Sequence, residues 1–166
     1  MSKSRFSPRE LALAGIIAGI YAGLTLILPI PQYHGIQLRV AEAMTLLPFL
    51  FPAAVPGLAI GCMLANLLTG AVIYDVIFGA LATLLGALGA YALRRFTLRR
   101  VRFLLPVATI LANVLIVPFV LQYAYRVPDA WWFLCLTVGI GEMLAAGVGG
   151  VLMTFLLDKY KSVLFR

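Results

Sequence analysis

Two residues of opposite charge, Arg39 and Glu42, stand three positions apart at the start of an apolar stretch, in a chain that is 63% hydrophobic. Each charge costs about 2.5–3.5 kcal/mol at the centre of a membrane helix on insertion scales. Such residues therefore usually face a partner, a cavity or a ligand rather than lipid. The pair favours a carrier over a passive membrane anchor. The alternative is an internal ion pair between positions i and i+3 of one helix.

Further polar side chains interrupt the other apolar runs. Glu142 lies in the last run and has no cation within a helical turn, while Asn66 and Asn113 lie in two other runs. If successive helices alternate in direction, these side chains and the Arg39–Glu42 pair fall mainly in the outer half of the membrane. A one-sided polar set from several helices predicts a cavity that opens outward. The alternative is that the amides only hold neighbouring helices together.

Residues for nucleophilic or metal chemistry are sparse. Cys62 and Cys135 lie within apolar runs and lack the CxxC spacing, which is typical of small buried hydrophobes. His34 is the single histidine of the chain, so a metal site built on it is not expected. The glycines do not form a phosphate-binding loop. The sequence therefore predicts a protein that is not an enzyme and that holds neither a cofactor nor a metal ion.

The elements that must carry these residues follow from length and hydropathy. Charged residues make up 11% of the 166 residues and the mean hydropathy is +1.05, whereas a soluble domain carries about a quarter charged residues. A helix needs about 20 apolar residues to cross the hydrocarbon core. Long apolar runs extend over 11–31, 53–73, 76–93, 103–121 and 130–157, and a shorter run over 40–51. We therefore expect a single all-α domain, residues 1–166, with six transmembrane helices.

The basic residues predict the orientation of these helices. Eleven of the thirteen lysines and arginines precede the first run, lie between 93 and 103, or follow the last run. With six crossings they all lie on one side, which the positive-inside rule assigns to the cytoplasm together with both termini. A nucleic-acid patch is the competing interpretation, but these arginines sit in a short loop between helices.

The first apolar run carries two ridges of small residues. Ala14, Ala18 and Ala22 recur every four residues, and Gly15, Gly19 and Gly23 run alongside them. Such strips let another helix approach closely. They serve either internal packing within the bundle or an external partner in the membrane.

Four segments carry a resemblance to a known family. The segment 37–48, QLRVAEAMTLLP, resembles the signature of the QueT queuosine-precursor transporter family, and so does PAAVPGLAIGCMLANLL at 52–68. The segments DVIFGALATL at 75–84 and VGIGE at 138–142 extend the resemblance over most of the chain. The family is similar to the S components of energy-coupling factor (ECF) transporters.

The resemblance implies an architecture and partners. S components are six-helix proteins of the bacterial cell membrane that bind a micronutrient and deliver it through a T subunit and two ATPases. The expected partners are thus a small molecule, the T subunit, the ATPases and the bilayer, with no nucleic acid and no obligate homo-oligomer. Ala14, Ala18 and Ala22 correspond to the Ala-x-x-x-Ala motif by which S components dock on the T subunit.

The resemblance also implies a ligand chemistry. Queuosine precursors are 7-deazaguanines, some of which carry a cationic aminomethyl group. Their paired N–H donors suit a carboxylate, and their carbonyl oxygen and ring faces require a donor and an aromatic wall. The candidate substrate-binding residues are Gln37, Arg39, Glu42, Asn66, Asn113, Trp131 and Glu142.

The resulting hypothesis is an S component of an ECF-type importer for a queuosine precursor. The alternatives are an S component for another vitamin-like micronutrient and a small homo-oligomeric channel assembled on the alanine strip. An intramembrane enzyme that uses Glu42 and Glu142 would need a nucleophile or metal ligands, for which the sequence offers no candidates.

Overall fold

A computed structural model describes residues 7–28, 38–96 and 99–164, and this part of the chain is helical without a strand. The first elements are α1 (Pro8–Ile27), η1 (Val40–Phe49), α2 (Ala54–Leu68) and α3 (Ile73–Leu93). They are followed by η2 (Arg99–Leu104), α4 (Leu105–Phe119), η3 (Val120–Ala124), α5 (Trp131–Glu142), η4 (Met143–Gly150) and α6 (Val151–Leu164). The all-α prediction is confirmed for the described residues.

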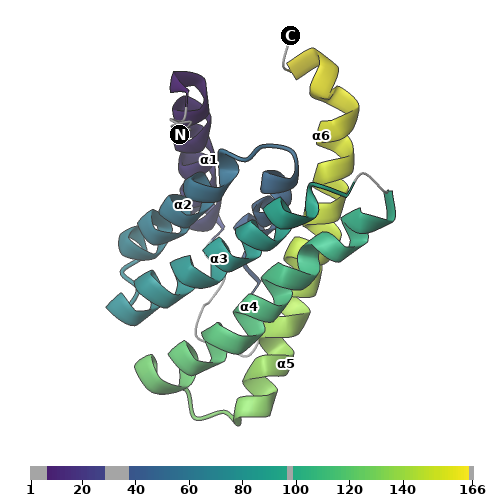
Figure 1. Ribbon diagram of the computed structural model, residues 1–166. Coiled ribbons are helices and arrows are strands. Elements are labelled where there is room, and N and C mark those ends of the chain that lie inside the picture. The colour runs from purple at the N-terminus through teal and green to yellow at the C-terminus, as the bar shows by residue number, and fades with distance from the viewer. Residues whose placement is uncertain (1–6, 29–37, 97–98, 165–166) are drawn as a thin grey trace, which may run out of the picture.

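Four helical segments are long and apolar enough to cross a membrane. They span Pro8–Ile27, Ile73–Leu93, Arg102–Ala124 and Trp131–Lys159. The last of these is the predicted run 130–157, which forms one helix through α5, the π-helical η4 and α6. The other two predicted crossings, η1 and α2, are shorter apolar helices. Six crossings and the cytoplasmic termini therefore remain predictions, although α1 begins and α6 ends at the same end of the molecule (Figure 1).

The run 40–51 folds as η1, a ten-residue 3-10 helix that occupies the middle of the bundle. It contacts α1, α2, α3, α4, η4 and α6, which explains why Ala41, Glu42 and most of the following side chains are buried. The 3-10 geometry advances about 2.0 Å per residue, so ten residues cover more depth than they would in an α-helix. The polar residues of this segment are thus placed in the interior by the helices around it.

Large apolar side chains cover the outside of the bundle. Ile16 and Ile20 on α1, Ile77 on α3 and Leu111 on α4 are all about half exposed or more. Contiguous apolar surface of this kind is rare on soluble monomers. It fits helices whose outer faces contact lipid, since a helix satisfies its backbone hydrogen bonds internally.

The alanine ridge of α1 packs inside the bundle, against two glycines of α2. A Cβ atom at Gly57 would lie 2.6 Å from the carbonyl oxygen of Ala14, and one at Gly61 would lie 2.9 Å from that of Ala18. Ala18 and Ala22 are buried, whereas Gly15 and Gly19 are exposed. Internal packing therefore accounts for the four-residue spacing, and the docking role of this ridge stays a prediction.

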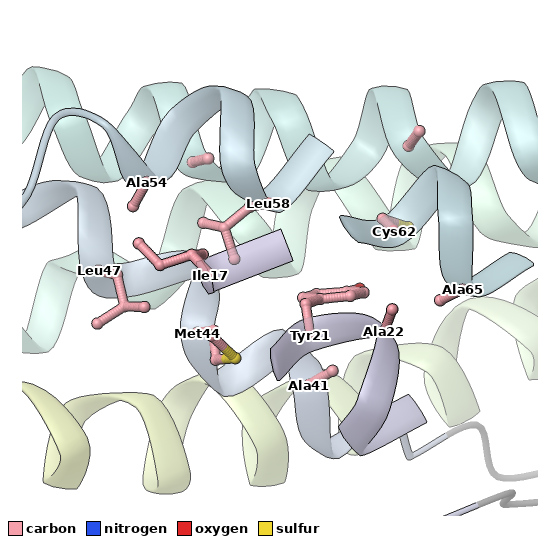
Figure 2. Packing of buried hydrophobic residues seen from close by; sticks show 12 residues of the cluster. Ile17, Tyr21, Ala22, Ala41, Met44, Leu47, Ala54, Leu58, Cys62 and Ala65 are labelled. Carbon is pink, nitrogen blue, oxygen red and sulfur yellow. The ribbon is translucent and has the colours of Figure 1, made fainter. Parts of the chain in front are cut away.

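Tyr21 continues this interface toward the centre of the molecule. Its ring belongs to one buried cluster with Ile17, Leu58, Cys62 and Met44, so it joins α1 to α2 and η1 (Figure 2). The side chain is 1% exposed. A phenol buried this deeply requires a hydrogen-bond partner, and η1 supplies one.

Candidate functional site

The 3-10 geometry of η1 aligns Arg39, Glu42 and Thr45. A 3-10 helix has three residues per turn, so side chains at i and i+3 lie directly above one another. Arg39 is the N-cap of the helix, and the other two lie one and two turns further along. Each of the three meets a different neighbour in the bundle. The three-residue spacing of Arg39 and Glu42 therefore places them in one row along η1.

Glu42 accepts hydrogen bonds from two other helices. The Tyr21 hydroxyl of α1 donates to Glu42 Oε1, and the Thr83 hydroxyl of α3 donates to the same oxygen at 2.9 Å. Glu42 is fully buried. Its second carboxylate oxygen, Oε2, has no hydrogen-bond partner among the described residues. One oxygen of this carboxylate is thus held by the protein, and the other is left as an acceptor.

Thr45 ties the same ridge to α4. Its hydroxyl donates to the carbonyl oxygen of Glu42 at 2.6 Å and accepts from the Thr109 hydroxyl at 3.0 Å. Gly86 of α3 makes room for this contact, since a Cβ atom there would lie 2.6 Å from Thr109 Oγ1. Hydrogen bonds from α1, α3 and α4 therefore fix η1 around Glu42.

Arg39 pairs with Asp75 of α3 rather than with Glu42. Arg39 Nη2 lies 3.3 Å from Asp75 Oδ2, and the two side chains are 11% and 4% exposed. The alternative of an internal Arg39–Glu42 ion pair thus gives way to an ion pair between η1 and α3. Asp75 lies in the first turn of α3, where the helix dipole also favours a negative charge.

Two further residues converge on Asp75. The Tyr125 hydroxyl donates to Asp75 Oδ2 at 3.0 Å, and Asn66 Nδ2 of α2 donates to the Asp75 carbonyl oxygen at 2.9 Å. Gly79, one turn further along α3, leaves the space for this cluster. A Cβ atom there would lie 2.8 Å from Asn66 Nδ2 and 3.0 Å from Asp75 Oδ1. Residues from α2, η1 and the end of η3 therefore meet at Asp75: Arg39 and Tyr125 at its carboxylate and Asn66 at its backbone carbonyl.

The bond to Asp75 fixes the orientation of the Asn66 amide. Because Nδ2 donates to a carbonyl oxygen, the amide oxygen Oδ1 must point the other way. Asn66 is 1% exposed, and its Oδ1 has no partner among the described residues. This side chain therefore offers an acceptor to the interior, and its part in substrate binding stays a prediction.

Glu142, at the end of α5, is the third buried polar residue with an unpartnered oxygen in the described part of the chain. It is 4% exposed, its Oε2 atom has no hydrogen-bond partner in the described part of the chain, and it forms no ion pair there. Glu142 is the residue before η4, and η4 packs against η1. Glycines bring its helix to η1, since a Cβ atom at Gly150 would lie 2.9 Å from the Ala43 carbonyl oxygen.

Other predicted residues are not joined to this cluster by a described contact. Asn113 is buried on α4, and its Nδ2 donates to the Thr109 carbonyl oxygen at 3.1 Å, one turn back along the same helix. Trp131 packs on Phe119, with ring centroids 4.1 Å apart. Gln37 lies outside the described residues. The substrate roles of all three stay predictions.

A groove of about 630 Å³ lies away from the polar cluster, on the outer face of α3 and α4. Its walls include Tyr74, Phe78, Leu115, Phe119 and Tyr123, all of which are more than 40% exposed. Such an apolar surface faces the hydrocarbon in a membrane protein. The polar residues, by contrast, are closed off in the centre, so the predicted outward-opening cavity does not coincide with this groove.

Tyr21, Thr83 and Tyr125 are site residues that the sequence analysis missed. Thr83 follows Asp75 by eight residues and Gly79 by four, which places all three on one face of α3. The four-residue spacing of Asp75, Gly79 and Thr83 could therefore have indicated Thr83 from the sequence alone. Tyr21 lies between Ala18 and Ala22 on the buried face of α1. An aromatic residue at such a position is typical of a hydrophobic core, so the sequence did not single it out.

Comparison with known proteins identifies the family to which this chain belongs. The family model described as QueT transporter matches residues 11–159. No curated protein and no solved structure matches the chain. The matched region contains η1, α2, α3, α4 and α5 with every site residue described above. The chain belongs to the QueT transporter family.

Proposed function

We propose that this protein is the substrate-binding S component of an ECF-type importer and that it takes up a queuosine precursor of the 7-deazaguanine class. The family assignment establishes a transporter, and the apolar helices suit a multi-pass membrane protein. The identity of the substrate and of the partner subunits is the part that we propose.

One observation carries the choice of substrate. Three side-chain atoms in the described part of the chain are buried without a hydrogen-bond partner, and all three are oxygens: Glu42 Oε2, Asn66 Oδ1 and Glu142 Oε2. An unpaired buried oxygen costs about 1–3 kcal/mol, and more if it is charged. The set therefore suits a ligand that is rich in N–H donors. The Watson–Crick edge of a guanine-type base has adjacent N–H donors that a carboxylate accepts as a pair.

Transport requires an orientation and a partner. In the proposed arrangement all six helices cross the bacterial cell membrane, and the end where α1 begins and α6 ends faces the cytoplasm. Arg102 of η2 lies at that end, where it pairs with Asp158 of α6. The T subunit docks on α1, and two ATPases drive release of the substrate inward. The surface of α1 that is open to such a partner carries Gly15, Ile16, Gly19 and Ile20, whereas Ala18 and Ala22 of the predicted docking motif are buried in the bundle.

Calorimetric titration of the purified full-length protein tests the substrate. We expect a 7-deazaguanine to bind and adenine to fail, because adenine lacks the adjacent ring N–H and amino donors. A protein that binds no 7-deazaguanine but binds another vitamin-like compound would replace the proposed substrate and leave the transporter class in place. Ion flux through reconstituted protein without any partner subunit would favour a channel instead.

A further inference from the structure

The groove of about 630 Å³ on the outer face of α3 and α4 is separate from the polar cluster. It lies where α3 begins beside the end of α4 and η3 (Figure 1). Both walls belong to helical segments that are long and apolar enough to cross a membrane. Its lining includes Tyr74, Phe78, Leu115, Phe119, Tyr123 and Ala124. The groove is therefore open to the lipid around the protein.

The length of the groove matches one leaflet of a bilayer. Its lining on α4 and η3 runs from Leu115 to Ala124. At about 1.5 Å per residue this segment covers about 13 Å, whereas half of the hydrocarbon core is about 15 Å thick. An acyl chain that enters at the end of η3 would therefore lie along the groove for most of the depth of its leaflet.

The aromatic wall of the groove is held in place by its neighbours. Phe119 stacks on Tyr123, with ring centroids 6.1 Å apart, and packs on Trp131 at 4.1 Å. Next to the groove, the Tyr125 hydroxyl donates to Asp75 Oδ2 at 3.0 Å and so joins the end of η3 to the start of α3. Side chains that are already ordered lose little entropy when a ligand binds. The groove is thus a preformed site.

The mouth of the groove combines phenol groups with a nearby positive charge. Tyr74 and Tyr123 are 58% and 75% exposed, and tyrosines are enriched where a membrane meets water. Arg126 follows Ala124 by two residues and is exposed. Arginine attracts anionic lipid headgroups and binds phosphate oxygens in pairs. An apolar groove with a cation near its mouth is complementary to an amphiphile that has an acyl chain and an anionic headgroup.

From these features we propose that the groove between α3 and α4 binds a phospholipid, with one acyl chain along Phe78 and Leu115 and the phosphate at Arg126. The site does not depend on the proposed substrate, and only its place in the outer leaflet follows from the proposed orientation. The bound chain packs on the helix ends that Tyr125 and Asp75 join. It therefore stabilises the folded protein, because a ligand that binds only the folded state raises its stability.

Native mass spectrometry of the full-length protein, stripped of lipid in detergent, measures the binding of palmitoyl-oleoyl phosphatidylglycerol. We expect the first molecule to bind at least about tenfold more tightly than any further one. Glycerol phosphate, which lacks the chains, should not bind, and palmitoyl-oleoyl glycerol, which lacks the phosphate, should bind about fivefold more weakly. A series of equally weak lipid adducts would overturn the proposal. Pairing of two copies that excludes the lipid would also overturn it.

The variant Leu115→Trp fills the groove from its open side. Leu115 is 62% exposed, so the larger side chain does not enter the core. The affinity for phosphatidylglycerol should fall at least about tenfold, because the chain loses its packing contacts. Leu111→Trp is the matched control, since Leu111 lies one turn earlier on α4, is 55% exposed and lies outside the groove lining. Its affinity should stay within about twofold of wild type. An equal loss in both variants would overturn the proposed site.

The variant Arg126→Gln tests the headgroup contact and leaves the walls of the groove unchanged. The affinity for phosphatidylglycerol should fall about fivefold, while that for the phosphate-free glycerol lipid stays within about twofold. An unchanged affinity for phosphatidylglycerol would contradict the assignment to a phospholipid.

Thermal unfolding gives an independent readout. Added phosphatidylglycerol should raise the melting temperature of the wild type and of Leu111→Trp but not that of Leu115→Trp. Equal shifts in all three proteins would contradict the site. If Leu115→Trp does not fold, the two lipids compared on the wild type and Arg126→Gln decide the question. None of these failures affects the proposed substrate, which binds elsewhere.

Discussion

Replacing Glu142 with glutamine separates a ligand-binding carboxylate from a structural one. Glu142 is 4% exposed, and its Oε2 atom has no partner among the described residues. If it accepts paired N–H bonds from the ligand, Glu142→Gln removes charge-assisted hydrogen bonds worth about 1.5–3 kcal/mol. Since about 1.4 kcal/mol corresponds to a tenfold change, the dissociation constant should rise roughly 10- to 150-fold.

The same substitution should not weaken the fold. Glutamine has nearly the same volume and removes a buried charge that the protein does not compensate. The melting temperature of the ligand-free variant is therefore expected to equal or exceed that of the wild type. Binding is measured by calorimetry and unfolding by a thermal scan, both on protein in the same detergent.

Tyr21→Phe is the contrasting variant. It leaves the buried Glu42 carboxylate in place but removes one of its two donors, so it should lower the stability by about 1–3 kcal/mol. Glu142→Gln should keep or raise the stability, whereas Tyr21→Phe should lower it. This difference distinguishes Glu142, which we propose binds the ligand, from Glu42, which is held by hydrogen bonds from the protein. A folded Glu142→Gln protein with undiminished affinity would refute the reasoning, and so would a variant that loses stability as much as Tyr21→Phe does.

Three other predictions concern packing, docking and topology. Gly61→Ala places a Cβ atom 2.9 Å from backbone and side-chain atoms of α1, so it should lower the stability by about 1–3 kcal/mol in thermal unfolding. Gly15→Ala is the control: its Cβ atom meets nothing within 4 Å, and the stability should stay the same or rise slightly. Gly19→Trp, on the exposed face of α1, should abolish uptake by cells while the isolated protein still binds ligand; retained uptake would exclude this face as the docking surface. Cysteines introduced at Gly70 and Arg95 should react with a membrane-impermeant thiol reagent from the outside and the cytoplasmic side respectively, and labelling of both from one side would refute the six-crossing topology.

The sequence alone predicted the class of the protein and the helical segments well. Composition and run length are enough to identify an all-α membrane protein, because the bilayer sets both the hydropathy and the length of a crossing. The shortest run, 40–51, was recognised as a helix, but its 3-10 form and its central position were not. Both depend on how the other helices pack around it, and a single sequence does not contain that information.

The candidate site was predicted in part for the same reason. Glu42, Asn66 and Glu142 stood out because polar residues are rare in apolar runs, and each has an oxygen without a partner in the part of the chain that the structure describes. The partners were harder to infer. Arg39 pairs with a residue 36 positions away, and the donors to Glu42 lie 21 and 41 positions away. The three-residue spacing suggested that Arg39 pairs with Glu42, whereas in the folded chain Arg39 pairs with Asp75 of α3.

Mass spectrometry of the small molecules that co-purify with the full-length protein tests the central claim most directly. The protein is isolated without added ligand from cells that make queuosine precursors, beside Glu142→Gln prepared in the same way. We predict a 7-deazaguanine in near-stoichiometric amount with the wild type and a strongly reduced amount with the variant. A different compound enriched with the wild type, or a 7-deazaguanine retained equally by both proteins, would contradict the account.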